Sequence, residues 1–512
     1  MTTTRTASRS SSGAAERYNA SLILDGNLAA GRGDKLVIRT PEGEDLTYAQ
    51  LADRVARVGN LLKDLGVQPE QRVLLVLDDT PAFPAAFLGA MRIGAVPVPV
   101  NPLDKPEHFR HYLRDSEARV AIADATLMPA IVEARGDGKA LLIVANGEAE
   151  GALPLEEGMA ELPGELDPVD SHRDDPAFWL YSSGSTGLPK GVVHLHHDIA
   201  YTCDTYANEI LQISEADVTY STTKLFHAYG LGNGLSFPYS VGATTVLSSG
   251  RSNPARALEL AERFKPTLFF SVPALYRAML EQPAADLSSV RMCISAAEPL
   301  HPGIAERWEE RYGVPIVDGI GSTEMLHIYC SNRFDDVRRG TSGRPVRGYE
   351  LRLAEDTGEL FVRGDSCAAY YWHQHEKTKH CMVGEWFATG DRYRVDDDGY
   401  YVYEGRMDDM MKVGGLWVSP TDMETTLMQH PGVSEAVVIG VEVDEASRAK
   451  AFVIAAEGSA GDDALADDLR AWCKERLRRY EYPHLVEFVD ELPRTVTGKV
   501  QRFKLREREA SR

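Results

Sequence analysis

Cysteine is scarce in this chain and follows no pattern. The 512 residues contain six cysteines, and no two have the C-x-x-C spacing: Cys203, Cys293, Cys330, Cys367, Cys381 and Cys473. This scatter argues against a disulfide framework and against a zinc site. A chain without a disulfide framework suits a reducing compartment, and we expect a cytoplasmic protein.

Long apolar runs are also absent, and basic residues are outnumbered. No uninterrupted apolar segment approaches the roughly 18 residues that a membrane-spanning helix requires. The chain has 77 acidic and 55 basic residues, which gives a formal net charge of −22. A field of that sign repels phosphate backbones and anionic lipids, so we expect neither nucleic acid nor membrane as a partner.

The first fifteen residues, MTTTRTASRSSSGAA, contain no acidic residue. Their hydroxyl-rich, basic composition is compatible with a transit peptide. They show no apolar helical face, however, which favours a disordered tail over residues 1–15.

Short apolar runs alternate with helical segments along most of the remaining chain. Residues 73–77 and 118–123 are typical of buried strands, and residues 84–93, 199–211 and 254–264 are typical of helices. This alternation predicts parallel sheets covered by helices, an α/β fold. A chain of 512 residues exceeds what one core usually supports, so more than one domain is expected.

A segment rich in glycine and hydroxyl residues, Tyr181 to Gly191, follows an apolar run at residues 177–180 that is typical of a buried strand. Glycines let backbone N–H groups turn toward one point, hydroxyls add donors, and the lysine adds a positive charge, so the segment suits a triphosphate. An ordinary surface turn is the alternative. The residues predicted to bind ATP in this loop are Ser182, Ser183, Gly184, Ser185, Thr186, Gly187 and Lys190.

The order S-S-G-S-T-G-x-P-K-G is neither the P-loop nor the dinucleotide-binding turn. It closely resembles the phosphate loop of the adenylate-forming superfamily: acyl-CoA ligases, aryl-acid ligases, peptide-synthetase adenylation domains and beetle luciferases. The chain looks most like the benzoate:CoA ligase group, from about Tyr18 to about Leu505. The resemblance implies a large N-terminal domain, residues 16–407, of parallel-rich sheets flanked by helices plus a β-barrel-like part. It also implies a small mobile α+β domain, residues 408–512, beginning at a hinge at Asp408.

A second motif, D-G-I-G-S-T-E-M-L-H-I at residues 318–328, matches the Y-G-x-T-E element of this family. Glu324 supplies the kind of oxygen ligand that Mg²⁺ prefers, and the resemblance makes Thr323 a donor to the α-phosphate. Ile320 stands where many relatives have tyrosine, and benzoate-type members lack that tyrosine too. The resemblance places ATP against Asp318, Gly319 and Ile320. It also places ATP against Ser295, Ala296, Ala297 and Glu298, a segment for which tight helix–strand packing is the alternative.

The segment K-L-F-H-A-Y-G-L-G at residues 224–232 would by itself be read as a buried aromatic corner. In the family it forms a wall of the acyl pocket, which puts His227 near the substrate carboxylate and Ala228 and Tyr229 against the substrate ring. The same resemblance adds three pocket residues: Gly321, His327 and Ile328. A lone histidine such as His327 is also a common satisfied core residue. A flat apolar slot suits an aryl acid better than a long acyl chain.

Five positions in the C-terminal part take their roles from the resemblance. Asp391 and Arg406 suit the ribose hydroxyls and a phosphate. Gly414 and Gly415 would let a pantetheine arm pass close to the backbone. Lys499 matches the family's catalytic lysine, which stabilises the negative charge that develops during attack on the α-phosphate. Outside this context, Lys499 would be taken for an ordinary surface charge.

These residues imply an AMP-forming acid–thiol ligase that uses ATP and Mg²⁺. An aryl carboxylic acid forms an aryl-adenylate and pyrophosphate, and a phosphopantetheine thiol then displaces AMP. That thiol belongs to CoA or to an acyl carrier protein. The carrier protein is an alternative because Glu481 interrupts an arginine cluster and would repel the 3′-phosphate of CoA. The cluster is Arg476, Arg478 and Arg479.

Other functions of the same fold remain open. The chain could activate another small carboxylic acid, use the adenylate as a luciferase does, or bind without catalysis. The presence of both Glu324 and Lys499 disfavours a noncatalytic protein. We expect a monomer or a homodimer.

Overall fold

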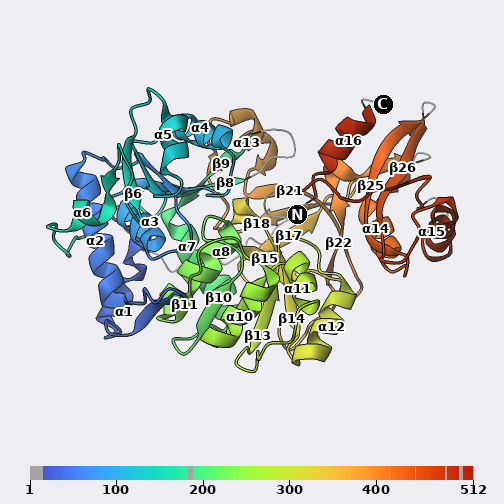
Figure 1. Cartoon of the computed structure of the whole chain (residues 1–512), viewed down its shortest axis with the longest axis horizontal. Coiled ribbons are helices and arrows are strands. Elements are labelled where there is room, and N and C mark those ends of the chain that lie inside the picture. The colour runs from blue at the N-terminus through green and yellow to red at the C-terminus, as the bar shows by residue number, and fades with distance from the viewer. Residues whose placement is uncertain are drawn as a thin grey trace, which may run out of the picture. The chain divides into compact units, whose positions relative to one another are not determined.

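The structure is a computed structural model that describes residues 15–182, 188–413, 416–443, 446–478, 481–494 and 500–510 (Figure 1). The chain divides into a large unit, Met1–Leu351 with Val362–Phe387, and a small unit, Arg352–Phe361 with Ala388–Arg512. Asp408, the predicted hinge, lies in the small unit within the short helical turn η5 (Met407–Asp409). The domain boundary at residue 408 stays a prediction.

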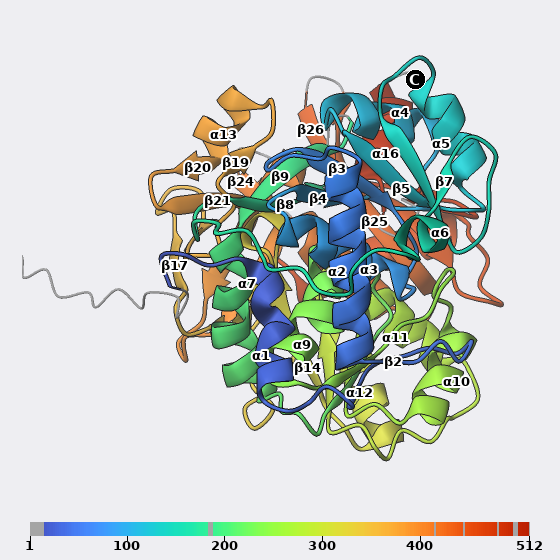
Figure 2. The ribbon, with the colours of Figure 1, turned by 90° about the vertical axis from the view of Figure 1, so that its left-hand side faces the viewer.

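Five parallel strands form the first sheet of the large unit, in the order β4-β3-β5-β6-β7. Its helices α4 and α5 cover the sheet through Phe109, Tyr112 and Ile131, and α2 and α3 lie side by side (Figure 2). Nearly all residues of the inner strands are buried, as expected for parallel strands between helices. The elements are β3 (Arg72–Val76), β4 (Val96–Pro99), β5 (Val120–Asp124), β6 (Leu141–Ala145), β7 (Leu153–Pro154), α2 (Tyr48–Asp64), α3 (Ala82–Arg92), α4 (Pro106–Asp115) and α5 (Met128–Arg135).

Nine strands form the second sheet, in the order β16-β15-β14-β13-β12-β10-β11-β1-β2. Its central pairs are parallel, and β2, β15 and β16 are antiparallel to their neighbours. Leu260, Tyr276 and Trp308 of three covering helices pack with strand residues in one buried cluster. The elements are β1 (Leu36–Arg39), β2 (Leu46–Thr47), β10 (Val218–Ser221), β11 (Thr244–Val246), β12 (Leu268–Ser271), β13 (Met292–Ser295), β14 (Ile316–Gly321), β15 (Ile328–Ser331), β16 (Arg344–Pro345), α10 (Pro254–Phe264), α11 (Pro273–Leu280) and α12 (Pro302–Tyr312).

A third, antiparallel sheet has the order β19-β9-β8 and carries the predicted phosphate loop. The strands are β8 (Pro176–Ser182), β9 (Lys190–Leu195) and β19 (Tyr370–Tyr371), so the strand predicted at residues 177–180 is confirmed. A Cβ added at Gly191 would lie 3.3 Å from Cβ of Trp372, which shows how closely the backbones approach there.

The helix predicted from residue 199 to residue 211 has two parts. It begins as α7 (His196–Thr202) and continues with wider π-helical turns as η2 (Cys203–Leu211). A second π-helical segment, η3 (Gly232–Ser236), joins α8 (Ala228–Leu231) to α9 (Phe237–Val241). π-Helical turns occur often at functional sites. The other elements of the large unit are η1 (Ala20–Ile23), α1 (Asp25–Ala29), α6 (Leu155–Met159), η4 (Thr323–Met325), α13 (His375–Cys381) and β20 (Met382–Val383).

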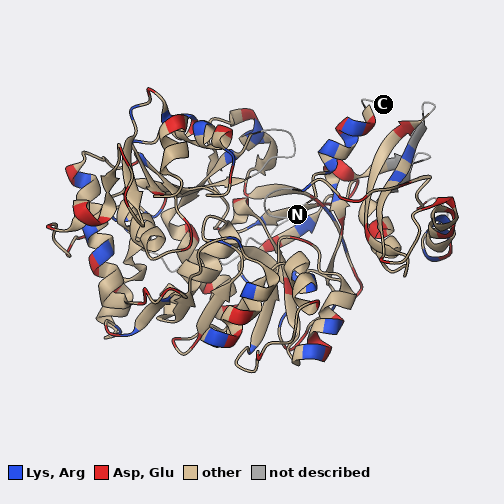
Figure 3. Ribbon diagram, viewed as in Figure 1, with Lys and Arg blue, Asp and Glu red and all other residues tan. Residues whose placement is uncertain are grey.

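The small unit has its own core. Met423 and Leu427 of α14 and Leu469 of α15 pack on Val438 and Ala451 of two antiparallel strands. Helix α16 carries charges of both signs (Figure 3). The elements are β21 (Trp386–Val395), β22 (Tyr401–Arg406), β23 (Met411–Val413), β24 (Leu416–Val418), β25 (Val433–Val443), β26 (Ala446–Ala455), β27 (Leu485–Phe488), α14 (Pro420–Met428), α15 (Asp463–Arg476) and α16 (Arg502–Ala510). Strands β17 (Glu350–Leu353) and β18 (Glu359–Arg363) precede them in the chain.

Parallel-rich sheets flanked by helices, followed by an α+β C-terminal part, confirm the predicted fold class. The mobility of the small domain stays a prediction. Among the residues that the structure describes, no helix combines the length and the apolar character that crossing a bilayer demands.

Candidate active site

The hairpin of β8 and β9 positions the two described ends of the phosphate loop. Ser182 and Lys190 are directly opposite each other in the strand register. The β8 end is fixed by Tyr181, whose hydroxyl donates to Asp115 Oδ2 at 2.7 Å, and the β9 end by His111 Nε2, 2.7 Å from the carbonyl of Pro189. The other predicted loop residues lie outside the described residues: Ser183, Gly184, Ser185, Thr186 and Gly187.

Lys190 and Glu324, predicted from separate motifs, meet in a buried ion pair. Lys190 Nζ lies 3.1 Å from Glu324 Oε1, and the hydroxyl of Tyr371 donates to the same oxygen at 2.7 Å. The ammonium group also lies 3.9 Å from the centre of the Tyr371 ring. Burial alone would raise the pKa of Glu324, but the charge of Lys190 and these hydrogen bonds outweigh it and hold the pKa below its usual value. The carboxylate is therefore charged at neutral pH, the state in which a carboxylate binds a metal ion.

Tyr371 belongs to no motif in the sequence analysis, and it is a new member of this site. So is His194, which fixes the backbone at Thr323. Its Nε2 lies 2.8 Å from the Thr323 carbonyl oxygen, and its Nδ1 lies 2.7 Å from Asp198 Oδ2. His194 and Asp198 are four residues apart in the chain, but no motif in the sequence indicated the contact of His194 with Thr323.

The carboxyl ends of β13 and β14 bring the two predicted adenine segments together. Ser295 and Asp318 are register partners, and burial raises the pKa of Asp318 to about 8. Asp318 is therefore largely uncharged at pH 7. Ala297 has a φ of 77°, an unusual left-handed conformation for a residue other than glycine. The neighbouring predicted residues Ala296 and Gly319 are buried, and Glu298 and Ile320 are partly buried.

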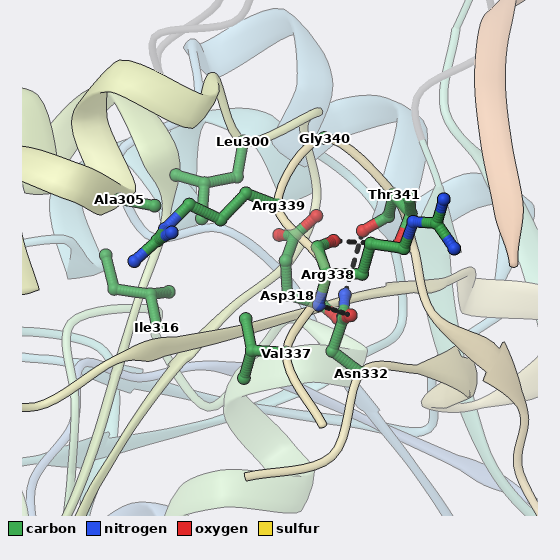
Figure 4. A pocket seen from close by; sticks show the side chains of 10 residues that line it. All are labelled: Leu300, Ala305, Ile316, Asp318, Asn332, Val337, Arg338, Arg339, Gly340 and Thr341. Atoms are coloured by element: carbon green, nitrogen blue, oxygen red, sulfur yellow. Dashed lines mark hydrogen bonds between the residues drawn. The ribbon is translucent and has the colours of Figure 1, made fainter. Parts of the chain in front are cut away.

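A small cavity of about 10 Å³ lies beside β14 and is lined by Asp318, Asn332 and the loop that follows (Figure 4). Asn332 Nδ2 donates to the carbonyls of Asp318 and Thr341, at 3.1 and 2.8 Å. The cavity has room for about one water molecule. The cavity is therefore too small for a substrate and is part of the packing around β14.

The predicted ring pocket is an aromatic cluster around His327. The centre of the His327 ring lies 5.0 Å from that of Tyr206, 5.5 Å from that of Tyr229 and 4.5 Å from that of Phe237. His327 is 3% exposed, its Nε2 lies 3.2 Å from Asn233 Oδ1, and burial lowers its pKa to about 3. The neutral His327 ring thus packs as a buried core residue does. Its neighbours Tyr229 and Phe237 lie in or next to the segments predicted to form the ring pocket.

The other predicted pocket residues lie on the two elements that meet at this cluster. A Cβ added at Gly321 would lie 2.5 Å from the His327 carbonyl oxygen, so β14 and β15 can approach each other only without a side chain there. Ile328 is fully buried and is the register partner of Gly321. Ala228 is also buried, at the start of α8 and directly before Tyr229. The structure thus brings together the pocket residues that the sequence analysis took from two separate motifs.

His227 begins α8 as its N-cap residue and is partly buried. The centre of its ring lies 4.2 Å from that of Phe226, and burial lowers its pKa to about 4. A neutral imidazole can hydrogen-bond to a carboxylate but offers it no positive charge at pH 7. Tyr229 is held by its hydroxyl, which donates to the carbonyl of Ile294 at 3.2 Å.

The small unit contains the predicted ribose-binding pair. Asp391 and Arg406 are register partners on β21 and β22, and Arg406 Nη1 lies 3.0 Å from Asp391 Oδ1. The predicted residues Gly414, Gly415 and Lys499 lie outside the described residues. The described residues on either side of the Lys499 segment, Arg494 and Val500, form an antiparallel bridge.

Comparison with known proteins gives two family matches. The model described as AMP-binding enzyme matches residues 27–372, and the model described as AMP-binding enzyme C-terminal domain matches residues 422–499. A benzoate–CoA ligase of Thauera aromatica is 47% identical over 96% of both chains. A 4-hydroxybenzoate–CoA/benzoate–CoA ligase of Rhodopseudomonas palustris is 42% identical, covering 96% of this chain and 94% of that protein.

Two solved structures are similar over nearly the whole chain. The anthranilate CoA ligase AuaEII in complex with anthranoyl-AMP has a TM-score of 0.92 and 41% identity, covering 98% of this chain and 99% of that one. A benzoate CoA ligase from Burkholderia xenovorans LB400 has a TM-score of 0.88 and 41% identity, covering 96% of this chain and 100% of that one.

Proposed function

Since the chain belongs to the AMP-binding enzyme family, we propose that it is an ATP-dependent aryl-acid ligase that makes an aryl thioester of CoA from benzoate or a close analogue. The observation that carries this proposal is the 47% identity to a benzoate–CoA ligase over 96% of both chains. The aromatic cluster around His327 supports it, because such a cluster suits a flat ring.

In the first step, a carboxylate oxygen of the acid attacks the α-phosphorus of ATP, and the bond from that phosphorus to pyrophosphate breaks. Lys190 offsets negative charge on the phosphates, Thr323 donates a hydrogen bond to the α-phosphate, and Lys499 stabilises the charge that develops there. Asp318 and the segment from Ser295 to Glu298 hold the adenine, while His227 orients the acid.

Glu324 fits the role of a Mg²⁺ ligand, because its carboxylate is charged and lies beside Lys190. Within the described residues no group of three or more His, Cys, Asp or Glu side chains forms a metal site by itself. Mg²⁺ commonly binds through one or two carboxylates together with substrate phosphates, and when bound it would neutralise charge on the leaving pyrophosphate.

In the second step, the thiol sulfur attacks the acyl carbon of the adenylate, and AMP leaves with the electrons of the broken bond. We assign this thiol to CoA. Glu481 is only 6% exposed, and its Oε2 accepts the backbone N–H of Arg478 at 3.3 Å. Its Oε1 lies 3.8 Å from Arg478 Nη1, so its charge is buried beside a positive one, which weakens the argument that it repels the 3′-phosphate of CoA. A carrier-protein acceptor is the second candidate, favoured by the same Arg478 side chain, which is 73% exposed.

The remaining assignments follow from the same proposal. We assign the enzyme to the cytoplasm, as a monomer or homodimer, with a small domain that moves about Asp408 between the two steps and presents Gly414 and Gly415 to the pantetheine arm. Asp391 and Arg406 are assigned to the ribose and a phosphate of ATP.

The test is to incubate the protein with benzoate, MgATP and CoA and to measure benzoyl-AMP and benzoyl-CoA by mass spectrometry. We expect both products. Benzoyl-AMP without benzoyl-CoA would support the carrier-protein acceptor. Parallel reactions with pantetheine in place of CoA measure how much the nucleotide end of CoA contributes. The absence of both products with benzoate and with hydroxy- and aminobenzoates would contradict the proposal.

A further inference from the structure

The segment from Ser366 to Tyr371 holds the turn that carries Glu324. The Ser366 hydroxyl donates to the carbonyl of Met325 at 2.8 Å, and the backbone N–H of Ala368 donates to the carbonyl of Glu324 at 2.7 Å. The hydroxyl of Tyr371 adds a third contact, to the Glu324 side chain. One short segment thus fixes both the backbone and the carboxylate of Glu324.

Tyr371 is itself held rigidly. It pairs with Val192 across β19 and β9, and its backbone N–H donates to Thr378 Oγ1 at 3.0 Å. Its side chain packs with Val192 and Ala368, and the residue is 2% exposed. A buried side chain with fixed neighbours keeps one rotamer, so its hydroxyl marks a fixed point.

Both contacts to the carboxylate fall on one oxygen. Tyr371 and Lys190 each reach Glu324 Oε1, at 2.7 and 3.1 Å. From this geometry we propose that Tyr371 is a positioning residue that anchors Oε1 and so presents Oε2 of Glu324 to the divalent cation. The inference rests on the proposed function for the identity of that cation.

Lys190 and Tyr371 have different parts in this arrangement. The lysine ammonium sits at the end of a flexible chain and can move to phosphate oxygens when a nucleotide arrives. The tyrosine hydroxyl is neutral and fixed, so its hydrogen bond to Oε1 persists after Lys190 has moved. The carboxylate therefore keeps its orientation while its cationic partner changes. Groups that orient a metal ligand in this way commonly affect metal affinity by about 10- to 100-fold.

The experiment compares Tyr371→Phe with the wild type, and with Tyr48→Phe as the matched control. Tyr48 is also fully buried, and its hydroxyl donates to the carbonyl of Ala243 at 2.7 Å, away from Glu324. Binding of Mn²⁺ is measured by electron paramagnetic resonance in the presence of a saturating nonhydrolysable ATP analogue. Binding of the metal-free analogue is measured separately.

We expect Tyr371→Phe to weaken Mn²⁺ binding by about tenfold, with a much smaller change in binding of the metal-free analogue. Tyr48→Phe should leave both affinities unchanged. Equal Mn²⁺ affinities in the wild type and Tyr371→Phe would overturn the proposal. So would an equal loss of Mn²⁺ and metal-free nucleotide binding, because that would indicate general damage to the site.

Folding of both variants is checked by thermal unfolding. The two are a matched pair because each substitution removes one buried hydroxyl. If Tyr371→Phe does not fold, Thr378→Val decides, since it removes the acceptor for the Tyr371 N–H and should weaken Mn²⁺ binding in the same direction. An unchanged Mn²⁺ affinity in Thr378→Val would then contradict the proposal. None of these readouts requires turnover, so a failure of the benzoate reaction and a failure of this inference are distinguishable.

Discussion

The carboxylate of Asp79 accepts the backbone N–H of Leu225 at 3.0 Å. Asp79 follows β3 of the first sheet, and Leu225 begins the segment that leads to His227 and Tyr229. Lys224 lies 3.3 Å from Asp78 and 4.0 Å from Asp79. A buried polar cluster thus connects the first sheet to the wall of the predicted acid pocket.

This cluster makes stability depend on pH. Burial raises the pKa of Asp79 from 3.8 to about 6, so the folded protein keeps the proton where the unfolded chain has lost it. The contribution of Asp79 therefore falls as the pH rises from about 4 to about 6, by on the order of 2–3 kcal/mol. Asp79→Asn does not titrate. We therefore expect the wild type to lose unfolding free energy relative to Asp79→Asn as the pH rises over this range. Urea unfolding of both proteins at several pH values measures the difference. A difference independent of pH would contradict this.

Lys499→Ala separates the two half-reactions. The lysine is proposed to act on charge that develops at the α-phosphate, which appears only when adenylate forms. We expect benzoyl-AMP formation to fall by at least about 100-fold, with a far smaller loss when synthetic benzoyl-AMP and CoA are supplied. Lys504→Ala, in the following helix, serves as the control. Equal losses in both half-reactions would remove Lys499 from its assigned role.

A buried ion pair supports the small unit. Arg502 Nη2 lies 2.8 and 2.6 Å from the two carboxylate oxygens of Glu424, which is 7% exposed. Glu424→Ala leaves Arg502 with Asp409, 3.6 Å away, as a carboxylate partner and should lower the unfolding free energy by about 1–3 kcal/mol. Asp467→Ala breaks the exposed pair with Arg470 and should change it little. Chemical denaturation monitored by hydrogen exchange in α16 checks both.

The close approach of Gly232 to His327 predicts a specificity defect. A Cβ added at Gly232 would lie 2.4 Å from His327 Cδ2, so Gly232→Ala must displace the ring. Forced repacking of this kind costs about 1–3 kcal/mol, and we expect KM for benzoate to rise about 5- to 100-fold. KM for ATP should change much less. Steady-state kinetics with each substrate varied in turn measures this, and parallel increases in both constants would argue against a ring pocket at His327.

The sequence was informative where function depends on residue types within one short segment. The apolar strand before the phosphate loop, the parallel sheets and the helix at residues 254–264 were all readable from local patterns. Lys190 and Glu324 were each predicted from their own motif, and the structure joins them in one ion pair.

What the sequence could not indicate are contacts between distant segments. Tyr371 reaches Glu324 from a strand far along the chain, and its own surroundings contain no catalytic motif. The π-helical turns at Cys203–Leu211 were also missed, because an apolar period near that of an α-helix does not distinguish the two.

The antiparallel pairing of β14 and β15 has a consequence for how substrate preference can change. Ile320 and Gly321 on one strand face Cys330 and Ile328 on the other, and Glu324 lies in the connection between them. A mutation at Ile328 that reshapes the predicted ring pocket therefore acts on the same hairpin that carries the predicted nucleotide-binding residues. Natural or laboratory evolution toward a larger acid would thus meet a trade-off: gains in acid scope would bring altered ATP affinity, and compensating changes would be selected in the connection itself.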